Sequence, residues 1–135
     1  MFNFLSITPY HYTYLNFFNG KIESRYQKFE NDYWGSTIKE LVKNAKFNKD
    51  ETIAIATCGI NHEISKNYFK KKGYYNLKFV SHENAEYVIM TNRAILRDEK
   101  IKDDYKLINC FDRFKGDDVF KVERNGLLLS VIRKI

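Results

Sequence analysis

A short turn, residues 58–61 with the sequence CGIN, separates an apolar run at residues 52–57 from His62 and Glu63. In open α/β sheets, a turn at the carboxyl end of a strand can hold a phosphate, because the amides of the following helix point toward it. Gly59 permits close approach, Asn61 can begin the helix, and His62 is a neighbouring base. These three residues are therefore a candidate small-ligand site. The turn lacks the full dinucleotide-binding glycine pattern and the P-loop lysine, so an ordinary exposed loop is the alternative.

A second histidine–glutamate pair, His82 and Glu83, follows the apolar residues 77–80. If the two strands are parallel, both pairs come to the same edge of the sheet. The two pairs could then act as general bases or bind a metal ion. The alternative is that they are ordinary exposed residues of the loops. The sequence predicts no catalytic residue, no metal site and no cofactor.

An acidic aromatic segment with the sequence FENDYWG occupies residues 29–35. A carboxylate beside exposed rings suits a sugar, whose C–H face stacks on an aromatic ring while the carboxylate accepts hydrogen bonds from hydroxyl groups. Glu30, Asp32, Tyr33 and Trp34 are the candidate binding residues. The alternatives are that Trp34 fills the core and that Asp32 accepts hydrogen bonds within the turn.

A helix is predicted directly after this segment. Gly35 can take a positive φ, and Thr37 with Glu40 has the spacing of a capping box. One apolar stripe, which we expect to pack inward, consists of Ile38, Leu41, Val42 and Ala45.

The middle of the chain predicts a β-α-β unit. Residues 52–57 form a buried strand, and a helix runs from the Asn61 cap to Gly73 with Ile64, Tyr68 and Phe69 facing inward. Residues 77–80 form the second strand. Residues 85–91 form the next, either antiparallel or joined through a loop that packs a single turn.

The C-terminal third predicts a surface helix or loop at residues 93–104, a strand at residues 106–111 and a hairpin. Asn125-Gly126 is the preferred type I′ turn between strands at residues 119–124 and 127–134. An ideal register places Phe120 and Val122 opposite Val131 and Leu129 on one buried face.

The chain of 135 residues is 44% hydrophobic, which fits one globular domain. We expect an α/β fold with a mixed sheet of about six strands, a Rossmann-like front, a C-terminal antiparallel hairpin and packed helices. Residues 1–28 are expected to form an aromatic N-terminal arm, and residues 29–135 the domain.

The net charge of +6 could indicate nucleic acid or anionic lipid as a partner. Nucleic acid is disfavoured, because basic and aromatic residues do not alternate on the predicted strands. The run Lys70-Lys71-Lys72 suits a solvated helix end, with a phosphate or lipid contact as the alternative. No apolar run approaches the length of a membrane-spanning helix.

Cys58 and Cys110 have no CxxC spacing, which excludes the usual metal and redox motifs. Buried free thiols near strand ends are the favoured interpretation. A disulfide is the alternative, if the strands are neighbours and the compartment is oxidising.

Two segments, PYHYTYLN at residues 9–16 and FENDYWGSTIKE at residues 29–40, resemble the region after the last membrane helix of bacterial GT-C-class membrane glycosyltransferases. These enzymes are related to the dolichyl-phosphate-mannose and aminoarabinose transferases. The matching positions are Pro9, Tyr10, Tyr12, Tyr14, Asn16, Arg25 or Tyr26, Phe29, Glu30, Asp32, Tyr33, Trp34, Gly35, Lys39 and Glu40. The chain departs from the pattern at His11 and Leu15 and lacks the membrane helices. In these enzymes the catalytic acidic residue lies in an early loop of the membrane part, so the resemblance assigns that role to no residue here.

The resemblance implies a soluble, non-catalytic accessory domain of a glycosyltransferase that uses a polyprenyl-phosphate sugar. Its expected partners are the membrane part of the enzyme, the bilayer surface and the polyprenyl-phosphate sugar, at the periplasmic face of the inner membrane. As the alternative to a sugar contact, Asp32 and Trp34 would then anchor the domain to the membrane part. Residues 2–7 would then be the end of a transmembrane helix. The alternative is a freestanding, cytoplasmic, Rossmann-like module that binds a nucleotide or another small ligand.

Overall fold

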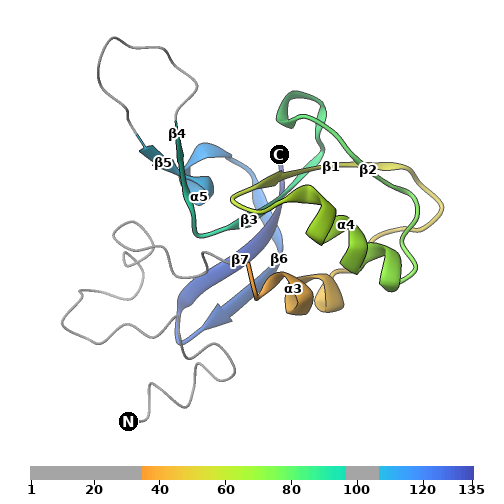
Figure 1. The fold of residues 1–135 in the computed structure, drawn as a ribbon, viewed down its shortest axis with the longest axis horizontal. Coiled ribbons are helices and arrows are strands. Elements are labelled where there is room, and N and C mark those ends of the chain that lie inside the picture. Colours follow the sequence, from red (N-terminus) through yellow and green to blue (C-terminus); the bar gives the residue numbers. More distant parts are fainter. Residues whose placement is uncertain (1–34, 97–106) are drawn as a thin grey trace.

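The computed structural model describes residues 35–96 and 107–135, which are coloured in Figure 1. The expected N-terminal arm lies outside the described residues. In the described part, a five-stranded sheet has the strand order β2-β1-β3-β7-β6. The strands are β1 (Ile53–Cys58), β2 (Leu77–Phe79), β3 (Tyr87–Thr91), β6 (Asp117–Arg124) and β7 (Leu127–Lys134).

The sheet is parallel at one end and antiparallel at the other. β1 pairs in parallel with β2 and β3, whereas β7 pairs antiparallel with β3 and β6. The expected α/β class with a mixed sheet, a parallel front and a C-terminal hairpin is confirmed.

Two helices, α3 (Ile38–Asn44) and α4 (His62–Lys71), cover one face of this sheet and lie beside each other (Figure 1). The predicted stripe on α3 is buried against Phe69 of α4 and against apolar residues of the sheet. On α4, Phe69 is buried and Tyr68 packs partly against the same core. Ile64 was expected to face inward but is 43% exposed, and the inward position one residue later is taken by Ser65.

The opposite face of the sheet carries a second core. Val88, Met90 and Val131 pack there with Cys110 and Phe111 of the short helix α5 (Cys110–Arg113). A two-stranded sheet of β4 (Ala94–Leu96) and β5 (Leu107–Asn109) leads into α5. Two expectations were therefore wrong: residues 94–96 form a strand instead of a helix or loop, and the strand expected at residues 106–111 ends in a helical turn capped by Asn109.

A short connection joins β2 to β3 although both are parallel to β1. Phe79 at the end of β2 and Tyr87 at the start of β3 both lie opposite Ile55 of β1. Because β3 begins at the level where β2 ends, the chain does not have to run back along the sheet. A single 3-10 turn, η4 (His82–Asn84), is sufficient, which selects the single-turn alternative.

The hairpin turn is confirmed, but its expected register is wrong. Asn125 and Gly126 have φ values of 52° and 74°, as a type I′ turn requires. An irregularity between Val122 and Glu123 then places Val122 opposite Ser130, and Phe120 lies opposite Ile132. The extra residue in β7 sends Val131 to the second core, while Leu129 and Ile132 face α3 and α4.

The start of α3 also differs from the expected capping box. Thr37 has helical dihedrals and makes no side-chain capping bond. Its buried hydroxyl instead donates a 2.7 Å hydrogen bond to Ser130 Oγ of β7, and Glu40 pairs with Arg124 at 2.6 Å. Long-range partners have replaced the local cap. Gly35 does take the positive φ, 63°, that the turn into the helix requires.

Cys58 and Cys110 form a disulfide, so the favoured interpretation of two free thiols was wrong. The bond joins the end of β1 to the start of α5 within the second core, where both cysteines are buried. None of the described helices is long and apolar enough to cross a membrane.

Candidate functional site

The turn after β1 holds the first group of candidate residues, and protein atoms fill the space beside it. Gly59 has a φ of 81°, and its carbonyl accepts a hydrogen bond from Thr91 Oγ1 at 3.1 Å. A Cβ at this position would lie 2.7 Å from Thr91 Oγ1 and 2.9 Å from Arg93 Cβ. Glycine is therefore required here by packing against β3 and the residues after it.

Two amides in the first turn of α4 bond to Asn61. Asn61 caps the helix as predicted, because its side chain accepts a 2.9 Å hydrogen bond from the Glu63 amide. The Ile64 amide bonds to the Asn61 carbonyl. Exposed Glu63 contacts His62 at 3.0 Å and Lys66 at 3.4 Å. The Lys66 ammonium, with a smaller contribution from His62, lowers the pKa of the Glu63 carboxyl below its usual value.

His62 and His82 line one hollow of about 300 Å³ at the carboxyl edge of β1 and β2. The two loops therefore do converge, as parallel strands require. His82 Nε2 lies 2.8 Å from the Thr57 carbonyl, which can only accept, so this nitrogen carries the proton. The His82 ring also contacts Phe114, with centroids 4.9 Å apart. Both interactions hold the loop in place.

Metal binding finds little support in this hollow. Within residues 35–96 and 107–135, no three His, Cys, Asp or Glu side chains are grouped as a metal site would need. The hollow has two imidazoles, and one nitrogen of His82 is already bonded to the backbone.

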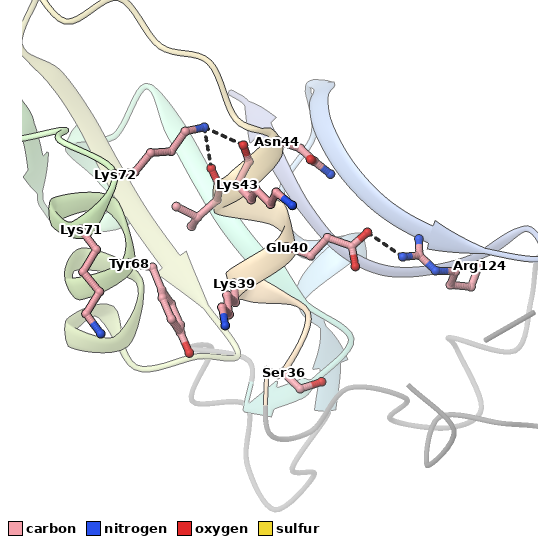
Figure 2. Close-up of a pocket in the computed structure, with 10 residues that line it drawn as sticks. Ser36, Lys39, Glu40, Lys43, Asn44, Tyr68, Lys71, Lys72 and Arg124 are labelled. Atoms are coloured by element: carbon pink, nitrogen blue, oxygen red, sulfur yellow. Dashed lines mark hydrogen bonds and ion pairs between the residues drawn. The ribbon is translucent and has the colours of Figure 1, made fainter. Parts of the chain in front are cut away.

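A larger groove of about 1100 Å³ runs between α3 and α4 and reaches the end of β6 (Figure 2). Five basic side chains and one acidic one line it: Lys39, Lys43, Lys71, Lys72, Arg124 and Glu40. The sequence analysis did not identify this groove. One signal was available, because Lys39 and Lys43 are four residues apart and so share one face of a helix.

The charges in this groove are only partly compensated. Arg124 and Glu40 form an ion pair at 2.6 Å. The Lys72 ammonium donates to the carbonyls of Val42, Lys43 and Ala45 at the end of α3. The run 70–72 is therefore more than a solvated helix end. Lys39, Lys43 and Lys71 are exposed and form no ion pair within residues 35–96 and 107–135.

The second group of candidate residues, Glu30, Asp32, Tyr33 and Trp34, lies outside the described residues. Their proposed sugar-binding role stays a prediction.

Comparisons with protein-family models, with curated proteins and with solved structures found no match.

Proposed function

We propose that this chain is a non-catalytic, extramembrane accessory domain of a membrane glycosyltransferase that uses a polyprenyl-phosphate sugar, and that it works at the periplasmic face of the inner membrane. The structural observation that carries the proposal is the buried disulfide between Cys58 and Cys110. The sequence support is the resemblance over residues 9–16 and 29–40.

The disulfide supports an oxidising compartment as the place where this chain folds. Disulfides persist in oxidising compartments such as the bacterial periplasm and are rare where glutathione and thioredoxin keep thiols reduced. Cys58 is 3% exposed and Cys110 is 0% exposed, so the bond belongs to the core. A disulfide buried in the second core suits a domain that folds outside the cytoplasm.

The compartment is tested by trapping thiols in living cells with a maleimide polymer, with and without prior reduction. We expect the two cysteines to resist modification until the chain is reduced and unfolded. Cys58→Ser with Cys110→Ser is the negative control for labelling. Thiols that react in unfolded chain without reduction would contradict a periplasmic location.

The accessory role is tested by reconstituting sugar transfer. The membrane part of the transferase, co-expressed with this chain, should transfer sugar from the polyprenyl-phosphate donor faster than the membrane part alone. Equal transfer with and without the chain would contradict the proposal. A Trp34→Ala variant separates the two roles considered for residues 30–34: an anchor predicts loss of co-purification with the membrane part, and a sugar contact predicts a higher KM with co-purification retained.

A second candidate function rests on the hollow at His62 and His82. Its position, at the carboxyl edge of parallel strands, is where α/β proteins bind nucleotides and other small ligands. Calorimetry with nucleoside mono- and diphosphates tests this function. Saturable binding that His62→Ala abolishes would support it, and no heat with any nucleotide would exclude it. The exposed His62 is a better probe than Gly59, because a larger residue at position 59 disturbs the fold.

A further inference from the structure

We propose that the groove between α3 and α4 binds a phosphate-bearing ligand, a phosphorylated sugar, through Lys39, Lys71 and Tyr68. This inference does not depend on the proposed glycosyltransferase role, because it rests on the groove alone.

Charge is the first argument. Of the five cations that line the groove, Arg124 is paired with Glu40, and Lys72 is bonded to backbone carbonyls. Lys39, Lys43 and Lys71 remain, so three positive charges without an ion-pair partner among the described residues line one concave surface. A phosphate monoester carries nearly two negative charges at neutral pH and has three acceptor oxygens. It therefore matches several lysines better than a carboxylate does, because a carboxylate carries one charge and two oxygens. Lysine is a common phosphate ligand.

Geometry is the second argument. Figure 2 shows Lys39 of α3 and Lys71 of α4 extending toward the same end of the groove, with the Tyr68 ring between them. The Tyr68 hydroxyl points to that end, where it can donate to a phosphate oxygen. The partly exposed Tyr68 ring offers a flat surface for a sugar. A volume of about 1100 Å³ exceeds the need of an inorganic ion and leaves room for such a ring.

Rigidity is the third argument. Lys72, at the end of α4, bonds to the last carbonyls of α3 and so sets the spacing of the two walls. The Tyr74 hydroxyl accepts a 3.1 Å hydrogen bond from the Phe47 amide, which ties the segments after the two helices together. The walls of the groove are thus held in place before a ligand arrives, which reduces the entropic cost of binding.

Calorimetric titration of the full chain with glucose 1-phosphate tests the proposal, with glucose as the uncharged control. We expect saturable one-to-one binding of the phosphate ester and none of glucose. Lys39→Gln with Lys71→Gln should weaken binding at least tenfold, and Tyr68→Phe should weaken it severalfold. Lys78→Gln, an exposed lysine of β2 outside the groove, should leave the affinity within twofold.

Amide chemical-shift mapping in the same titration locates the ligand. Shifts confined to α3, α4 and the end of β6 support the proposal. Shifts centred on His62 and His82 would overturn it and favour the other hollow. Equal affinity of the wild type and the double lysine variant would also overturn it.

Two further probes identify the source of the phosphate. The first probe is vesicles of phosphatidylglycerol in phosphatidylcholine. If they bind the wild type but not the double lysine variant, the groove also accepts a phosphate ester carried by a lipid. Binding of a single-stranded oligonucleotide more tightly than glucose 1-phosphate would overturn the proposal, because it would indicate a general polyanion surface.

Discussion

Individual glycines show how closely single positions are constrained in this fold. Gly59 and Gly73 both have positive φ values, 81° and 87°. Gly59 faces Thr91 and Arg93, whereas the nearest atom to a Cβ at Gly73 is Lys49 Nζ at 3.5 Å, the end of a flexible side chain. The two positions therefore separate the cost of the backbone conformation from the cost of crowding.

Gly73→Ala should lower the free energy of unfolding by about 1–2 kcal/mol, the cost of a left-handed conformation. Gly59→Ala should cost about 2–5 kcal/mol, because overpacking is added. Urea denaturation of both variants measures the difference. Equal losses would show that the atoms around Gly59 move aside without cost.

At Glu63, the Lys66 hydrogen bond and the smaller effect of His62 lower the pKa of the carboxyl. A lowered pKa stabilises the folded protein above the unfolded-state pKa, and this contribution is lost as the pH falls through the folded-state pKa. NMR titration should find a Glu63 midpoint below that of an ordinary glutamate. In Lys66→Met the midpoint should rise, and an unchanged midpoint would contradict the assigned cause.

At the scale of elements, α3 is stabilised mainly by partners distant in sequence. Its first turn lacks a side-chain cap at Thr37, and its last carbonyls accept from Lys72, the residue that follows α4. A cation at this end also interacts favourably with the helix dipole. A helix of seven residues has little stability of its own, so these contacts and its buried stripe hold it.

Lys72→Met should lower the free energy of unfolding by about 1–2 kcal/mol, because three carbonyl groups lose a charged donor. Lys70→Met, which removes an exposed lysine of the same run, should change it by less than about 0.5 kcal/mol. Chemical denaturation compares the two. A similar, small effect of both would mean that water replaces Lys72 at the carbonyls.

At the scale of the whole molecule, the disulfide links β1 of the five-stranded sheet to α5, and the second core lies between the sheet and α5. It closes a loop with a sequence separation of 52 residues, from the end of β1 to α5. That loop includes α4 and the strands β2, β3, β4 and β5. The bond therefore restricts the unfolded chain over much of the domain.

Reduction of the disulfide should lower the free energy of unfolding by about 4 kcal/mol, the chain-entropy value for a loop of this length. Denaturation with and without a phosphine reductant measures the change. Cys58→Ser with Cys110→Ser should be less stable than the oxidised protein and should not respond to the reductant. Equal stability of oxidised and reduced wild type would show that the bond contributes nothing.

Local patterns in the sequence were sufficient for several elements. The 3.6-residue spacing of Ile38, Leu41 and Val42 predicted the buried face of α3, and Asn125-Gly126 predicted the hairpin turn. The Asn61 cap and the glycine end of α4 were also predicted. Each depends on neighbours within a few residues, and for that reason the sequence alone determined the α/β class and the order of its main elements.

Contacts between distant residues were decided only by the tertiary structure. The hydroxyl of Thr37 finds Ser130 instead of the local amide, the bulge at Leu129 moves Val131 to the other face, and Cys58 meets Cys110. The basic groove likewise forms because α3 and α4 pack side by side. Such pairings depend on competing burial and hydrogen bonding across the whole domain, and no short stretch of sequence contains that information.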